Sequence, residues 1–262
     1  MDISFDSLVV AFALTLIAGM GTAVGALASL LPQAREERFL AGALGFSAGV
    51  MLYVSFLDLM PQAIAELGAT ASARTANLHA VLAFFGGIAL IALIDLLVPE
   101  QANPHEYNHV ATQRAPGNRT GLMLALAIGI HNFPEGMATF VSALDGASVA
   151  VPIVVAITLH NIPEGIAVAV PVYNATGSRK RAMMLSILSG LAEPVGAAAG
   201  MLFLLPLWNP ELNALLLAVV AGIMVYISLD ELLPSAENYG HHHITITCLI
   251  AGMAVMATSM LL

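Results

Sequence analysis

Two hexamers of nearly identical sequence carry histidine, asparagine and glutamate at the same spacing. They read HNFPEG at residues 131–136 and HNIPEG at residues 160–165. In each, the histidine and the glutamate are four residues apart and share one face of a helix. The asparagine lies about 100° round the helix, next to that face. The residues concerned are His131, Asn132, Glu135, His160, Asn161 and Glu164. If the two helices cross at this level, imidazoles, carboxylates and amide oxygens converge.

This set of side chains indicates a metal site. Imidazole with carboxylate, and no thiolate, suits Zn²⁺, Fe²⁺ or Mn²⁺ and argues against a Cu(I) carrier. Each hexamer also contains a proline, which removes an amide donor and can kink the helix at its polar turn. A lone histidine or glutamate in a helix is more often a hydrogen-bonding partner than a ligand. Two matching constellations favour metal binding, and two bridging carboxylates could hold two ions.

The segments that must position these residues are predicted to cross a membrane. Hydrophobic residues make up 59% of the chain and charged residues only 10%, against about 25% charged in soluble domains. Long apolar runs are typical of transmembrane helices. Eight such runs are predicted, with short links and a single membrane domain over residues 1–262: 8–31, 40–65, 78–98, 121–143, 149–172, 182–207, 213–233 and 244–262. The fold class is therefore an all-α integral membrane protein.

The predicted membrane location makes three glutamates costly. Glu135 and Glu164 lie in the fourth and fifth spans, and Glu193 lies in the sixth. On insertion scales, the free energy of moving a carboxylate to the membrane centre is about 2.5–3.5 kcal/mol, so three carboxylates cost on the order of 8 kcal/mol. A cation or a set of hydrogen bonds must offset that free energy. Glu193 is therefore a further candidate metal ligand.

The distribution of basic residues predicts the orientation. With both termini outside, seven of the eight basic residues fall in inward-facing loops, and Arg74 alone faces out. The positive-inside rule favours that topology, which in a bacterium places both termini on the periplasmic side of the inner membrane. The formal net charge of −9 suits cation attraction and argues against a nucleic-acid partner.

An internal repeat is visible in the spans. Residues 48–63 and 221–236 share eight identities, among them Tyr, Ser and Pro, at a constant offset of 173. The first and sixth spans match more weakly at an offset of 171. The paired spans cross in opposite directions, since an odd number of spans separates them. This is an inverted-topology repeat, an architecture of many secondary transporters that hold substrate near the midplane.

The paired HNxPEG motifs, followed by SGLAEP at 189–194, resemble the Zrt/Irt-like (ZIP) metal transporter family, and its bacterial branch most closely. The resemblance covers essentially the whole chain. It implies a 3+2+3 helix bundle with a two-metal site. Members of that family carry zinc, and often iron, manganese, cobalt or cadmium (Zn²⁺, Fe²⁺, Mn²⁺, Co²⁺, Cd²⁺), towards the cytoplasm. An elevator-like movement of the metal-bearing helices is the mechanism favoured for them.

The resemblance also implies how the ligands divide. The first ion would be held by His131, Glu135, His160 and Glu164. The second would be held by Asn132, Asn161 and Glu193, with the two hexamer glutamates bridging. Some relatives have Asp in place of Asn161 and Gln in place of His160, so the second site in this chain is less anionic.

Other polar residues are candidates for the ion pathway. Asp58 lies near the outer end of the second span, and Asp230 and Glu231 lie near the inner end of the seventh, where they could pass ions in and out or simply be solvated helix ends. Loop histidines could capture arriving metal or could be only solvated: His105, His109, His241, His242 and His243.

An enzyme is the main alternative class of function. A zinc protease would need HExxH, and a di-iron oxidase would need Glu-x-x-His on two helices; neither occurs in the sequence. The prediction is therefore that the chain is not an enzyme. A metal-selective channel of the same fold stays open, as do the metal preference and the oligomeric state, a homodimer included. Besides the metal ion, membrane lipid is the expected partner.

Overall fold

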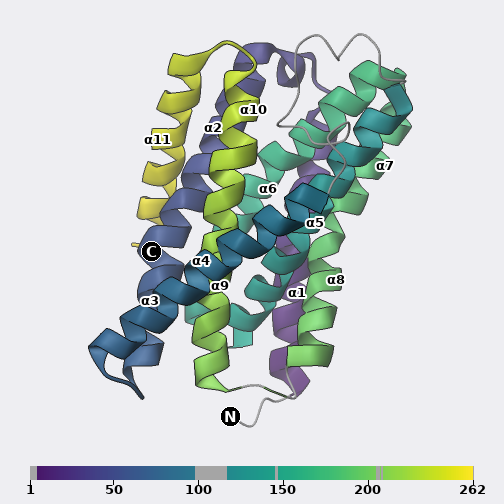
Figure 1. Cartoon of the computed structure of the whole chain (residues 1–262). Coiled ribbons are helices and arrows are strands. Elements are labelled where there is room, and N and C mark those ends of the chain that lie inside the picture. The colour runs from purple at the N-terminus through teal and green to yellow at the C-terminus, as the bar shows by residue number, and fades with distance from the viewer. Residues whose placement is uncertain (1–4, 98–116, 145–146, 205–206, 208, 262) are drawn as a thin grey trace.

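The computed structural model describes residues 5–97, 117–144, 147–204, 207 and 209–261, and this part of the chain contains helices and no strand. The long helical segments stand side by side in one bundle (Figure 1). In chain order they are α1 (Phe5–Ala28), α2–η2–α3 (Glu37–Val54, Ser55–Leu59, Met60–Gly68), α4 (Ala73–Leu97), α5 (Gly117–Leu144), α6 (Ala147–Thr176), α7–α8–η3 (Arg179–Gly190, Ala192–Ala199, Gly200–Leu204), α9–η5–α10 (Pro210–Ile227, Ser228–Leu232, Leu233–Glu237) and α11 (His242–Ser259).

The all-α membrane class predicted from the sequence is confirmed. In the described part of the chain, seven helical segments are long and apolar enough to cross a membrane. The remaining predicted span, 121–143, lies within α5, which is not one of the seven. It carries the polar hexamer 131–136. Large apolar side chains such as Leu82 and Phe85 are exposed on the outside of the bundle, where the lipid of a bilayer would contact them.

Local sequence explains several helix ends. α6 ends just before Gly177, whose φ of 64° is in the left-handed region that favours glycine. The next residue, Ser178, caps α7 by accepting a hydrogen bond from the Arg181 amide at 3.3 Å. α9 begins with Pro210 after Asn209, whose side-chain oxygen accepts from the Leu212 amide at 2.9 Å.

The inverted repeat is visible in the arrangement of the helices. α2 descends to α3 in Figure 1, whereas the matching α9 rises to α10. Both segments widen to a π-helix at the same repeat position, η2 in one and η5 in the other. Ser55 and Ser228 begin these turns, and each hydroxyl donates to the carbonyl four residues earlier, at 2.8 and 2.7 Å. The proline that follows each turn lacks an amide donor, which disfavours a regular α-helix there.

The weaker match between the first and sixth spans is also reflected in the packing. A Cβ built on Gly19 would lie 2.8 Å from the Gly190 carbonyl oxygen, and a Cβ on Gly190 would lie 2.8 Å from the Gly19 carbonyl oxygen. These two glycines are 171 residues apart, which is the offset of the repeat. Their reciprocal contact means that the pseudo-twofold axis passes between α1 and α7.

Two groups of helices share the bundle. α1 packs on α5, α6, α7 and α8, whereas α2, α3, α4, α9, α10 and α11 pack mainly on one another. In the second group, α2 packs on α11 and α9 on α4, so each repeat's third helix lies against the other repeat's second helix. The main link between the groups is α2 on α6, where the Ser47 hydroxyl donates to the His160 carbonyl at 3.3 Å.

Close contact between α1 and α6 predicts sensitivity at Gly25. A Cβ there would collide with the Ile162 carbonyl and the Gly165 backbone. We expect Gly25→Ala to destabilise the protein by about 1–3 kcal/mol, the usual cost of overpacking. The measurement is the thermal unfolding midpoint of detergent-purified protein. Gly86→Ala on α4 is the control, because nothing lies within 4 Å of its Cβ, and equal midpoints for both variants would contradict the packing.

Candidate metal centre

α5 and α6 carry the two hexamers side by side within the first group of helices. α5 continues as a helix through Pro134, and α6 does so through Pro163. Each hexamer therefore keeps the helical spacing on which the sequence argument rests. The side chain of His131 lies outside the described residues. The other six predicted ligands have described side chains.

A direct contact joins the two hexamers. His160 Nε2 on α6 lies 2.6 Å from Glu135 Oε1 on α5. Both side chains are buried, with exposed fractions of 0% and 4%. A buried imidazole and a buried carboxylate in contact are two candidate metal ligands brought together from two helices.

Glu193 on α8 joins the same group of side chains. Its Oε1 accepts a hydrogen bond of 2.5 Å from the Asn161 amide nitrogen. Glu193 is fully buried and lies within electrostatic range of Glu135 and Glu164. Three carboxylates from three helices thus share one enclosed region, where their mutual repulsion favours a bound cation.

The two asparagines are oriented by backbone carbonyls at equivalent positions of the repeat. Asn132 donates to the Ser189 carbonyl at 3.3 Å, and Asn161 donates to the Ala18 carbonyl at 2.9 Å. Ala18 and Ser189 are 171 residues apart, which is the repeat offset. A carbonyl can only accept, so the nitrogen of each amide must face it. This leaves the amide oxygens, which can bind a cation, for the interior.

Several buried oxygens have no hydrogen-bond partner within the described part of the chain, among them Asn132 Oδ1, Glu135 Oε2, Asn161 Oδ1 and Glu193 Oε2. A buried acceptor without a partner costs about 1–3 kcal/mol, and more when it is charged. All four belong to residues that the sequence predicts as ligands. A bound cation would supply the partner that oxygens of this kind lack.

The last residue of each hexamer sets the distance between helices. A Cβ on Gly136 would collide with the backbone of Glu193, and one on Gly165 would collide with the backbone of Thr22. Thr22 and Glu193 are again 171 residues apart. Sequence reasoning missed this role, although the glycine at the same place in both hexamers was a signal for it. Both glycines let a neighbouring helix approach the turn that carries the candidate ligands.

The candidate ligands do not form a complete coordination sphere. The described side chains include no set of three or more His, Cys, Asp and Glu residues already arranged to hold a metal ion. Two of the predicted ligands are asparagines, and the contact between His160 and Glu135 occupies coordination positions that a metal ion would take. Binding would therefore replace this contact and draw the carboxylates inward.

The predicted pathway residues lie apart from these side chains, in the π-helices. Asp58 is in η2, and Asp230 and Glu231 are in η5. The Tyr226 hydroxyl hydrogen-bonds Asp230, with Asp95 and Glu231 nearby. Asp95, at the end of α4, was not assigned from the sequence and joins this group.

The structure describes three of the five loop histidines. His105 and His109 lie outside the described residues. His242 Nδ1 lies 2.8 Å from Glu237 Oε1, and both side chains are exposed. His241 and His243 flank it at the start of α11, at the surface of the bundle.

Comparison with known proteins points to one family. The model of the ZIP zinc transporter family matches residues 97–260. A protein of Streptococcus mutans named zinc transporter ZupT is 53% identical over 96% of this chain and 97% of its own length. Proteins of the same name from Corynebacterium efficiens and Chlorobium phaeovibrioides are 53% and 56% identical over 98% and 96% of this chain, and over 98% and 97% of their own lengths.

The geometry predicts that Glu135 contributes strongly to metal affinity. Glu135→Gln keeps the shape of the side chain but removes the charge facing His160 and Glu193. We expect zinc affinity to fall at least tenfold, about 1.4 kcal/mol, in calorimetric titration of purified protein. Glu211→Gln, on an exposed acidic residue in the first turn of α9, is the matched control. Unchanged affinity in Glu135→Gln would remove this residue from the ligand set.

Proposed function

This chain belongs to the ZIP family of zinc transporters, and from that premise we propose how it holds and moves the ion. It is a divalent metal transporter and not an enzyme, and zinc is its transported substrate. The proposed centre lies between α5, α6 and α8. Its seven ligands would be His131, Asn132, Glu135, His160, Asn161, Glu164 and Glu193.

We propose that these ligands bind two ions. The first would be held by the histidines and glutamates of the two hexamers, and the second by the asparagines with Glu193. Glu135 and Glu164 would bridge the ions. The observation that carries the proposal is the set of four buried oxygens without a donor, which belong to Asn132, Glu135, Asn161 and Glu193. They come from both proposed half-sites.

The second half-site should bind its ion more weakly. Its asparagines are neutral, and the Asn161 amide nitrogen is already engaged by Glu193 at 2.5 Å and by the Ala18 carbonyl at 2.9 Å. A cation there must compete with the Asn161 amide for Glu193. The first half-site has two full carboxylate charges and imidazole nitrogen, a stronger combination for Zn²⁺.

Net movement is proposed to be uptake into the cytoplasm. The basic residues fall in the loops that the positive-inside rule places inside, so both termini would lie on the outer side of the bacterial inner membrane. Asp58 in η2 would then lie near the outer mouth, and Asp230 and Glu231 in η5 near the inner mouth. All eight helical segments would form a single membrane domain.

Alternating access is the mechanism we favour. The metal-bearing helices belong to one packing group, α1 with α5 to α8, and the remaining helices form the other. A sliding of one group against the other would expose the centre to each side in turn. The contact between Ser47 and the His160 carbonyl would have to break and re-form in each cycle. A channel of the same fold is the alternative, and uptake that saturates with zinc at rates far below pore conduction favours the carrier.

The two half-sites predict different mutant phenotypes. Glu164→Ala removes a bridging charge and should abolish zinc uptake into proteoliposomes. Asn161→Ala removes a neutral ligand of the second ion and should leave measurable uptake. Zinc uptake by Glu164→Ala at the wild-type rate would contradict the two-ion arrangement. Competition with Fe²⁺, Mn²⁺, Co²⁺ and Cd²⁺ in the same vesicles gives the metal preference.

The direction of zinc transport can be tested separately in cells. Cells that overproduce the protein should accumulate zinc and grow less well in high zinc, because uptake adds to the internal pool. The measurement is cellular zinc by elemental analysis, with Glu164→Ala, produced at equal membrane levels, as the control. Lower zinc content and greater resistance would assign the opposite direction.

A further inference from the structure

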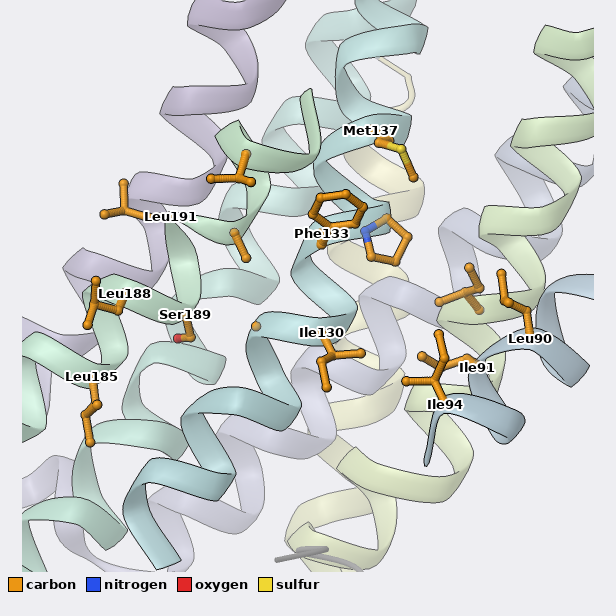
Figure 2. Close-up of a pocket in the computed structure, with 15 residues that line it drawn as sticks. Leu90, Ile91, Ile94, Ile130, Phe133, Met137, Leu185, Leu188, Ser189 and Leu191 are labelled. Carbon is orange, nitrogen blue, oxygen red and sulfur yellow. The ribbon is translucent and has the colours of Figure 1, made fainter. Parts of the chain in front are cut away.

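An apolar groove of about 960 Å³ opens on the outside of the bundle, behind the metal-bearing turn of α5. One wall is α4, with Leu90 and Ile94, and the other is formed by α7 and α8, with Leu188 (Figure 2). Phe133 and Met137 of α5 form the floor between the walls. Successive helix residues turn by about 100°, so these two side chains lie on the side of α5 away from Glu135.

The lining has the chemistry of a hydrocarbon site. None of its residues is charged, and its one hydroxyl, on Ser189, donates to the Ser186 carbonyl at 2.7 Å within its own helix. The groove is open to the surroundings along its rim, where Leu90 is 48% exposed, Leu188 54% and Val195 58%. A water-filled groove with this lining, at the depth of the membrane-spanning helices, would be unfavourable.

No part of the described chain fills the groove. α4 packs on α9 and α3, whereas α7 and α8 pack on α5, α6 and α1, and no substantial contact joins the two walls. Side chains facing an empty groove lose dispersion contacts on one side. In a bilayer the available filler is lipid hydrocarbon, and a flexible acyl chain can follow the space between the two walls.

The start of α7 adds a feature that selects the lipid. Arg181, Leu185 and Leu188 follow one another at spacings of four and three, so they share one face of the helix. Arg181 is exposed and lies about 6 Å along the axis from Leu185, which lines the groove. Arg179 and Lys180 are exposed beside it. An acyl chain that enters at Leu185 therefore leaves its headgroup beside Arg181, and Arg179 and Lys180 in the same turn add to the positive charge that attracts anionic lipids.

We propose that this groove binds an acyl chain of an anionic phospholipid, whose headgroup lies beside Arg181 at the basic start of α7. The walls belong to the two different packing groups, so the bound chain touches both of them as well as the back of α5. The site is separate from the metal centre and does not depend on which residues ligate the ion.

The test uses a photoreactive lipid in vesicles that contain the full chain. The probe is phosphatidylglycerol with a diazirine in the middle of one acyl chain, at a small fraction in phosphatidylcholine vesicles. After irradiation, mass spectrometry should find label on Phe133, Met137 or Leu188. The internal reference is Leu82, which is 61% exposed on α4 and does not line the groove. The same probe with a phosphatidylcholine headgroup should label the groove at least threefold less, relative to Leu82.

Neighbouring substitutions supply the matched control. Ile94→Trp fills the groove from the α4 wall and should lower groove labelling at least threefold, whereas Leu93→Trp, one residue away and outside the lining, should not. If Ile94→Trp does not fold, Leu188→Trp against Ile187→Trp tests the other wall. Any one of four results would overturn the proposal. The groove residues of the wild type could stay unlabelled, or the two variants of each pair could be labelled equally. The two headgroups could give equal labelling, or the groove could cross-link to a second copy of the chain.

Discussion

Glu135, Glu164 and Glu193 lie buried among membrane-spanning helices, and the free energy of placing their charges there constrains the structure around them. Each carboxylate costs about 2.5–3.5 kcal/mol at the membrane centre. The protein offsets part of this with an imidazole from His160 and an amide from Asn161, both fully buried. These partners do not satisfy every oxygen. A site that stays incomplete without a cation is suited to take one up and to release it.

The repeat supplies these partners almost symmetrically, and the symmetry is broken at one position. Asn132 and Asn161 are held by carbonyls at equivalent sites of α7 and α1, and the hexamer glycines rest on equivalent backbone. The equivalent of Glu193, however, is Thr22. A glutamate there would add a fourth buried carboxylate to three that already repel one another. Threonine keeps the backbone contact with Gly165 without that charge, so the second proposed half-site has one carboxylate of its own instead of two.

The sequence predicted those features that depend on spacing along the chain. The two hexamers, the apolar runs and the repeat offsets were sufficient to place the candidate ligands on adjacent helices and to pair the spans. Contacts between distant residues could not be predicted in this way. The hydroxyl of Ser47 reaches the carbonyl of His160, 113 residues away, and no local pattern indicates it. The groove beside α5 likewise exists because α4 and α7 pack on other helices, which spacing does not reveal.

The π-helices η2 and η5 make two of the membrane helices unusually tolerant of a change in length. Elsewhere in a helix, deletion of one residue rotates everything beyond it by about 100° and turns its buried face outward. A π-turn contains one residue more than the α-turn it replaces. Deletion of one residue within 55–59 or 228–232 would therefore keep the helix faces on either side of the turn in their original directions. Asp58 and Glu231 thus lie where the loss of one residue would not rotate the rest of the helix.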